Sequence, residues 1–160
     1  MFIVSLKPTG KKIFISICSM LLVICLIIGV GVIRGISPKA SANCEAGDYF
    51  LQASTNSERL EFFGQFGWKT SDEPISCKQV TIPTEFNAVY EQYNEIQTKQ
   101  GLDLLGYKGE QCDSYTYDIL NYKGDDNVVI NILVHDGVVI AGDVCSTRLD
   151  GFMTGFFKEQ

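Results

Sequence analysis

His135 is the only histidine in the 160-residue chain, so any catalytic or metal-binding site that needs an imidazole must include this residue. Ser-His-Asp and Cys-His arrangements use an imidazole as the general base, and many zinc sites use several histidines as ligands. His135 directly precedes Asp136-Gly137, a dipeptide that favours a tight β-turn. A histidine beside a turn is usually a surface side chain with ordinary hydrogen bonds, so we predict no catalytic or zinc-binding role for it.

The acidic residues and the glycines form no recognisable site either. Asp72-Glu73 and Asp125-Asp126-Asn127 are short acidic clusters, whereas a calcium loop spreads its ligands over about twelve residues and closes with a glutamate. The sequence has no G-x-S-x-G, no phosphate-binding glycine loop and no C-x-x-C. We therefore expect no enzyme activity, no cofactor and no bound metal. A hydrolase with an unrecognised carboxylate pair is the least favoured alternative.

Charge divides the chain at about residue 40. All 19 acidic residues lie at or after Glu45, whereas five of the 13 basic residues precede Ala40. The part from Ala40 onward therefore has eight basic and 19 acidic residues, which is a net charge of −11. A domain with this charge repels phosphate backbones, so we expect no nucleic-acid partner.

An apolar run without any charged residue extends over residues 13–33. A helix of this length spans about 30 Å, which is the thickness of a hydrocarbon core. The run is also longer than the roughly 7–15 apolar residues of a secretory signal peptide. Three lysines precede the run and two basic residues follow it. This distribution of charge favours a cytoplasmic location for residues 1–12. We therefore predict a single-pass transmembrane helix in the cell membrane, with the remaining chain outside.

A possible cleavage site follows the apolar run. Ala40-Ser41-Ala42 has the small-x-small pattern after which signal peptidases cut, but it lies nine residues beyond Ile33. Because the run is long enough to span the bilayer, we favour a retained signal anchor. Release by cleavage after Ala42, giving a secreted protein, is the alternative, and both alternatives place the domain outside the cytoplasm.

The rest of the chain is predicted to be a linker, residues 34–54, followed by one domain, residues 55–160. Residues 55–68 are expected to form a short helix whose Thr55 and Glu58 fit a capping box. The aromatic residues of this segment are interpreted as core residues rather than as a ligand site. They are Phe62, Phe63, Phe66 and Trp68.

A second helix is predicted over residues 84–101, with Thr84 as its N-cap and Gly101 as its end. Its apolar stripe comprises Phe86, Val89, Tyr90, Tyr93 and Ile96 or Gln97. Four strands are predicted from alternating and β-branched segments, at residues 75–83, 110–122, 128–135 and 138–145. The pattern predicts an α+β fold in which two helices pack on an antiparallel sheet that ends in a three-strand meander.

Asp136-Gly137 lies between two β-branched runs and predicts a two-residue type I′ hairpin. In that register His135 faces Val138 and Val128 faces Cys145. Asp143 and Cys145 then share a face with the even-numbered residues of the first strand. Both faces are mostly apolar, so we expect a helix on each face, or a helix on one and a partner on the other.

Five stretches of the sequence resemble a family of small bacterial domains of unknown function, number 4830 in its series. They are "GQFGW", "IPTEFNAVYEQYNEIQTKQGLDLLGYKG", "YTYDILNY", "NILVHDGVVIAGDVC" and "DGFMTGF". The resemblance covers about residues 57–157 and implies an extracytoplasmic α+β domain of Gram-positive bacteria, often behind a membrane segment. It implies no activity.

These features favour a membrane-tethered binding or regulatory domain of the bacterial cell envelope with a protein partner. A structural or accessory envelope module is the alternative. Four cysteines lie beyond the apolar run, namely Cys44, Cys77, Cys112 and Cys145. Whether they form disulfides stays open, except that the meander separates Cys112 from Cys145 by about 30 Å and so excludes that pair.

Overall fold

The computed structural model describes residues 40–45 and 47–158. The predicted cytoplasmic segment 1–12 and the predicted membrane helix 13–33 lie outside the described residues. Within the described part, no helix is long and apolar enough to cross a membrane.

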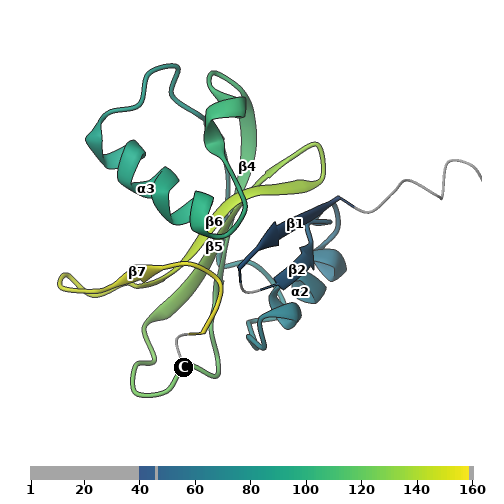
Figure 1. The fold of residues 1–160 in the computed structure, drawn as a ribbon. Helices are drawn as coiled ribbons and strands as arrows, with labels where there is room; N and C mark the ends of the chain where they lie inside the picture. The colour runs from purple at the N-terminus through teal and green to yellow at the C-terminus, as the bar shows by residue number, and fades with distance from the viewer. Residues whose placement is uncertain (1–39, 46, 159–160) are drawn as a thin grey trace, which may run out of the picture. The chain divides into compact units, whose positions relative to one another are not determined.

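A five-stranded antiparallel sheet forms the centre of the domain, and its strands are neighbours in chain order (Figure 1). The strands are β3 (Ser76–Thr81), β4 (Gln111–Asp118), β5 (Val128–His135), β6 (Val138–Ser146) and β7 (Met153–Thr154). Four of them match predicted strands, and the meander of β4, β5 and β6 is confirmed. The edge strand β7 is not among the predictions, because two residues are too few to show a pattern.

The hairpin between β5 and β6 has the predicted turn. Asp136 and Gly137 have φ values of 49° and 78°, and His135 pairs with Val138. Both central residues of a type I′ turn need positive φ, which glycine adopts without strain. The predicted register fails further from the turn, where Val128 pairs with Ser146 instead of Cys145.

The cause of this register shift is a β-bulge opposite Leu133 and Val134. Val134 pairs with Val139 and Leu133 with Ala141, so β6 has one extra residue there. A bulge of this kind turns every following side chain to the other face of the sheet. Asp143 and Cys145 therefore lie on the face opposite to the one predicted.

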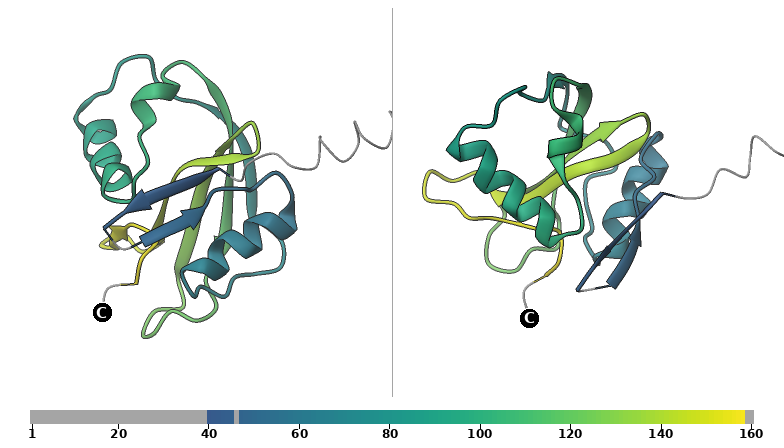
Figure 2. Two further views of the ribbon diagram at one scale, coloured as in Figure 1. Left: turned by 45° about the vertical axis from the view of Figure 1, so that its right-hand side comes forward. Right: turned by 45° about the horizontal axis from the view of Figure 1, so that its top comes forward.

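One helix covers each face of the sheet (Figures 1 and 2). On one face α2 (Asn56–Gln65) contributes Phe62 and Phe63 to the larger core, together with the even-numbered apolar residues of β5. On the other face α3 (Ala88–Lys99) and the 3₁₀ helix η1 (Leu104–Tyr107) cover a smaller core that includes Ile140 and Ala141. The two apolar faces of the hairpin are thus both explained by packing within the chain.

The observed ends of the two helices match the predicted ends only in part. The capping box of Thr55 and Glu58 is present. The N-cap of α3 is Asn87 rather than Thr84, because the Asn87 side chain accepts a hydrogen bond from the backbone N–H of Tyr90. The helix therefore begins later than predicted, and Val89 is exposed instead of joining the buried stripe, while Gln97 is buried.

Part of the predicted linker 34–54 is a β-hairpin, formed by β1 (Ser41–Cys44) and β2 (Gly47–Phe50). Tyr49 is buried against the rings of Phe62 and Phe66, and its hydroxyl donates to the carbonyl of Gln100 (2.7 Å). The hairpin also packs closely against the chain after α3, because a Cβ on Gly101 would lie 2.3 Å from the carbonyl oxygen of Asn43.

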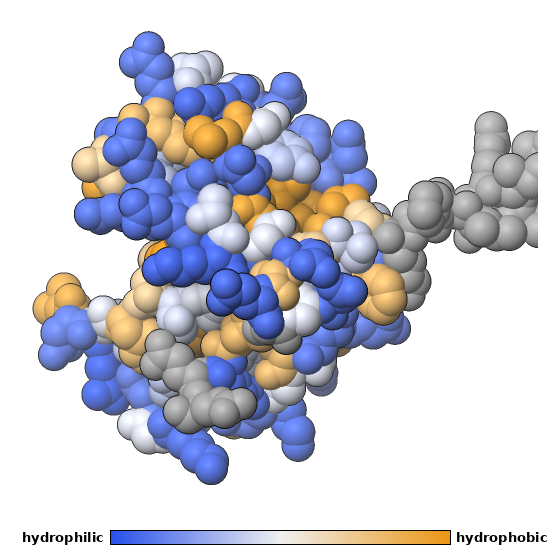
Figure 3. Space-filling view, viewed as in Figure 1, coloured by the Kyte–Doolittle hydropathy of each residue, from blue (hydrophilic) through white to orange (hydrophobic). Residues whose placement is uncertain are grey.

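The surface of the domain is mostly hydrophilic on the side seen in Figure 3, in keeping with its acidic composition. Hydrophobic residues also gather there at the tip of the loop between β6 and β7, at the left of the view. Leu149 in this loop is fully exposed, and Met153 on β7 is 51% exposed. The apolar surface therefore includes the edge of the sheet that β7 forms.

Candidate binding site

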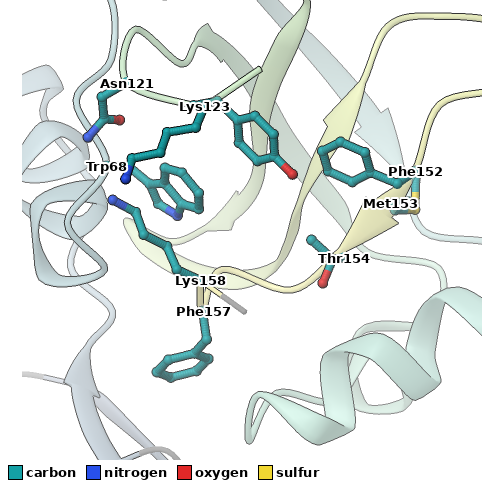
Figure 4. Close-up of a pocket in the computed structure, with 9 residues that line it drawn as sticks. Trp68, Asn121, Lys123, Phe152, Met153, Thr154, Phe157 and Lys158 are labelled. Carbon is teal, nitrogen blue, oxygen red and sulfur yellow. The ribbon is translucent and has the colours of Figure 1, made fainter. Parts of the chain in front are cut away.

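A groove of about 650 Å³ lies beside β7, at the end of the sheet opposite the Asp136-Gly137 turn. Four segments that are far apart in the sequence line it (Figure 4). They are Trp68 after α2, Asn121, Tyr122 and Lys123 in the loop after β4, Phe152, Met153 and Thr154 at β7, and Phe157 and Lys158 near the C-terminus. Only the tertiary fold brings these segments together.

Three aromatic rings form a stack along the groove. The rings of Trp68 and Tyr122 are nearly parallel, with centroids 6.0 Å apart and an interplanar angle of 15°. Tyr122 and Phe152 continue the stack at 5.3 Å and 22°. Trp68 is only 7% exposed, whereas Phe152 is 36% exposed. The stack thus runs from the core to the surface, and its outer end is accessible to a ligand.

Two lysines give the groove a positive charge. The Lys158 ammonium lies 4.4 Å from the centre of the Trp68 ring and donates to the carbonyl of Gly67 (2.7 Å). Lys123 also lines the groove, and its side chain extends towards the Trp68 ring, as that of Lys158 does (Figure 4). Among the described residues that line the groove, none has a carboxylate, although the chain from Ala40 onward carries a net charge of −11. The groove therefore attracts anionic groups within an otherwise acidic domain.

Hydrogen bonds hold the walls of the groove in place. The Asn121 side chain donates to the carbonyl of Gly67 (3.0 Å) and accepts from the backbone N–H of Lys69 (3.0 Å), which joins two loops. The indole N–H of Trp68 donates to the carbonyl of Phe156 (2.7 Å). Phe156 is fully buried, so the C-terminal segment is part of the core. These contacts give the groove a preformed shape.

A second polar cluster lies under α3, with a buried carboxylate at its centre. The Asp143 carboxylate, 3% exposed, accepts hydrogen bonds from the Tyr93 hydroxyl (3.1 Å) and from the Asn131 amide (3.0 Å). Burial raises the pKa of Asp143, and burial also raises the pKa of the neighbouring Cys145 to about 11. A thiol with this pKa is a poor nucleophile at neutral pH. The cluster has the hydrogen bonds of a structural network rather than the exposure of a catalytic site.

His135 lies at the end of the sheet away from the groove. Its Nδ1 is 2.9 Å from the carbonyl oxygen of Gln111, and its ring packs edge-on against Tyr107. Its partners are thus those of a surface histidine that joins two strands.

The acidic clusters stabilise turns. The Asp125 carboxylate accepts from the backbone N–H of Asn127 (2.9 Å) and pairs with Arg148 (3.2 Å). These contacts lower the pKa of Asp125, and the hydrogen bond from the backbone of Asn127 has the largest effect. Asp72 accepts a hydrogen bond from Asn56 through its backbone carbonyl. Among the described residues, no group of three His, Cys, Asp or Glu side chains is placed to hold a metal ion.

The groove is not among the sequence predictions. The sequence predicts Trp68 as a core residue, and its burial confirms this, but its ring also lines the groove. The sequence does show two aromatic residues, Tyr122 and Phe152, in turn-rich segments. Nothing in their positions along the chain indicates that the two rings stack.

Comparisons with known proteins assign the chain to a family but not to a function. The family model described as "Domain of unknown function (DUF4830)" matches residues 62–144. The comparisons with curated proteins and with solved structures found no match. The matched region includes Trp68 and the loop after β4, and it ends before β7.

Proposed function

The chain belongs to the family of domain of unknown function 4830, and we propose that it is a membrane-tethered, extracytoplasmic binding domain that takes a protein partner in its groove. The observation that carries this proposal is the groove itself. It combines an exposed aromatic residue, Phe152, with two lysines and a preformed shape. Aromatic residues are enriched at protein interfaces, where they often supply much of the binding energy.

The membrane tether rests on the apolar run at residues 13–33, which is long enough to span a bilayer. The alternative of release after Ala42 is weakened by the position of this residue. Ala42 is 5% exposed and pairs with Tyr49 within β1 and β2. Cleavage there would remove the first half of β1, and the partner strand would lose the backbone hydrogen bonds that this half supplies.

Binding is tested with the full chain in its native membrane. Photo-crosslinking in cells, with a benzophenone amino acid introduced at Thr154 in the groove wall, is expected to give a discrete adduct with another protein. Phe152→Ser should abolish this adduct, because it removes the exposed ring at the groove mouth. Val89→Ser is the matched control, since Val89 is 70% exposed on α3 and lies outside the groove.

An adduct that persists in Phe152→Ser at wild-type yield would contradict the proposal, because the partner would then not depend on the groove. Absence of a discrete adduct in the wild type would favour the alternative, a structural envelope module without a discrete ligand. The tether is tested separately by intact mass of the membrane-bound protein. We expect residues 1–42 to be retained, and a mature chain that begins at Asn43 would contradict the tether without affecting the groove.

A further inference from the structure

Within the described residues, the outer edge of β7 has backbone groups that no other strand pairs with. The backbone N–H of Ser146 donates to the carbonyl of Phe152 (3.0 Å), so these two residues form a hydrogen-bonded pair of the antiparallel ladder. The next pair, Cys145 with Met153, is therefore a non-hydrogen-bonded pair. It follows that the N–H and C=O of Met153 point away from β6. No strand of the described part pairs with β7 on that side.

This edge is not protected in the usual ways. Edge strands are commonly blocked by a charged side chain, a proline or a covering loop. Phe152, Met153 and Thr154 carry none of these features, and the first two are exposed. Because β7 is only two residues long, backbone pairing alone would hold a ligand weakly. The adjoining groove provides the additional contacts.

The charge of the groove indicates the kind of side chain that it accepts. A lysine ammonium has three donors, and Lys158 uses one of them on the carbonyl of Gly67. The remaining donors, with those of Lys123, suit a carboxylate. Asp125 in the same loop is already paired with Arg148, so it does not neutralise these lysines directly.

The aromatic stack argues against a sugar or a nucleobase as the ligand. Such ligands need an open ring face on which to stack. The ring of Trp68 is covered by Tyr122 and by the Lys158 ammonium, and Tyr122 is itself stacked between Trp68 and Phe152. The accessible part is the single ring of Phe152, which suits an apolar side chain.

We propose that the groove binds an extended acidic segment of a partner protein, which adds as a strand to the outer edge of β7 and directs carboxylates to Lys123 and Lys158. This proposal rests on the proposed function, because it names the chemistry of the segment that the binding domain takes. Addition of a strand uses the backbone of the ligand for affinity and alternate side chains for specificity.

The test is selection from a library of random nine-residue peptides displayed on phage, with the full chain held in nanodiscs of zwitterionic lipid. Enriched peptides should contain aspartate or glutamate at alternate positions between apolar residues. Affinity of a synthetic enriched peptide without tryptophan is then measured from the emission of Trp68. This residue is the only tryptophan of the chain, so its emission reports on the groove.

Two substitutions separate the contributions of charge and backbone. Lys123→Gln with Lys158→Gln should raise the Kd of the peptide about tenfold or more and reduce its salt dependence. Met153→Pro should raise the Kd about three- to tenfold, because it removes the outward N–H without removing a bond to β6. Met153→Ala keeps that N–H and is the reference for loss of the Met153 side chain, so the Kd of Met153→Pro should exceed that of Met153→Ala about three- to tenfold. All three variants should keep the melting temperature of the wild type, so that a change in Kd reports on binding and not on folding.

Several results would overturn this inference. The selection would contradict it if no peptide is enriched, or if the enriched peptides lack acidic residues. Equal Kd values for Met153→Pro and Met153→Ala would show that the outward N–H does not bind the peptide. Binding of anionic vesicles or polysaccharide in the groove, in place of peptide, would show that the ligand is not a protein segment. If one of these occurs while Phe152→Ser still abolishes the crosslink in cells, the binding function stands and only the ligand class is wrong. If Phe152→Ser leaves the crosslink intact, the proposed function itself fails.

Discussion

Gln100 accepts a hydrogen bond of 2.6 Å from the backbone N–H of Phe156, which lies 56 positions further along the chain. The same side chain donates to the carbonyl of Gly142 on β6 (3.1 Å). Gln100 follows α3, the helix on the face of the sheet away from the larger core, whereas Phe156 belongs to that core. One amide therefore joins the two halves of the domain and fixes the C-terminal segment that carries Phe157 and Lys158.

Gln100→Ala is expected to lower the free energy of unfolding by about 1–3 kcal/mol, because the buried N–H of Phe156 loses its acceptor. It should also shift the emission of Trp68, whose indole N–H is bonded to the carbonyl of Phe156. Urea unfolding followed by tryptophan emission measures both effects. Gln92→Ala, at an exposed position of α3, is the control and should change neither. Equal stability of the two variants would show that the C-terminal segment is held by other contacts.

Gly137→Val should destabilise the domain by about 1–3 kcal/mol, which is the usual cost of forcing a β-branched residue into positive φ. Gly137 has a φ of 78°, and a Cβ there would meet the Ser54 hydroxyl oxygen at 2.0 Å. Gly64→Ala is a control in α2, where a Cβ has no neighbour within 4 Å. That change should leave the melting temperature equal or higher, since alanine favours helix. A Gly137→Val domain that melts like the wild type would contradict the type I′ turn.

Non-reducing peptide mapping is expected to find no bond between Cys112 and Cys145. The register places Cys112 next to Asp113, which pairs with Val134 near the Asp136-Gly137 turn, while Cys145 pairs with Val129 at the other end of the sheet. The four described cysteines are all free thiols in the structure. Recovery of a linked Cys112–Cys145 peptide from monomeric protein would contradict the meander.

The same cysteines should differ in their rate of alkylation. Burial raises the pKa of Cys145 to about 11, so iodoacetamide at pH 8 should modify it slowly. Cys77 is exposed and should react first. Mass spectrometry of timed samples gives the order, and early labelling of Cys145 in folded protein would show that α3 opens readily.

Asp143 should make the stability of the domain fall as the pH rises. Its pKa is raised in the folded state by burial, while Tyr93 and Asn131 only partly offset this effect. The folded chain therefore holds this proton more tightly than the unfolded chain. The resulting stabilisation is present below the ordinary pKa of 3.8 and is lost as the pH rises through the folded-state pKa.

The contribution of Asp143 is isolated by subtracting the unfolding free energy of Asp143→Asn from that of the wild type at each pH. We expect this difference to decrease from pH 4 upward, by at most about 1.4 kcal/mol per pH unit, until the carboxyl is ionised in both states. A difference that increases with pH would mean that the hydrogen bonds from Tyr93 and Asn131 outweigh burial.

Local signals in the sequence were sufficient for most elements of the fold. The capping box of Thr55 and Glu58, the Asp136-Gly137 turn and the apolar runs around that turn predict one helix and the central hairpin correctly. These signals are reliable because caps, turns and side-chain alternation depend on residues that are close in the chain. The α+β fold class follows from the same patterns, whereas the family follows from the resemblance of five longer stretches of the sequence.

Predictions failed where a distant contact decided the local structure. The bulge in β6 has no signature in the sequence, yet it moves Asp143 to the face under α3. The hairpin of β1 and β2 looks like a linker in the sequence, because the packing of Tyr49 on α2 has no local signal.

The sequence by itself determined the acidic character of the domain, the apolar run before it, the two helices and the meander, since each depends on composition or on neighbouring residues. The tertiary structure alone decided the groove. Trp68, Tyr122, Phe152 and Lys158 come from four separate segments, and no spacing relates them. They meet because the antiparallel meander and the buried Phe156 bring loop ends and the C-terminal segment to one edge of the sheet. A site made of such segments is a property of the packed chain, because each segment contributes one wall and none forms a site alone.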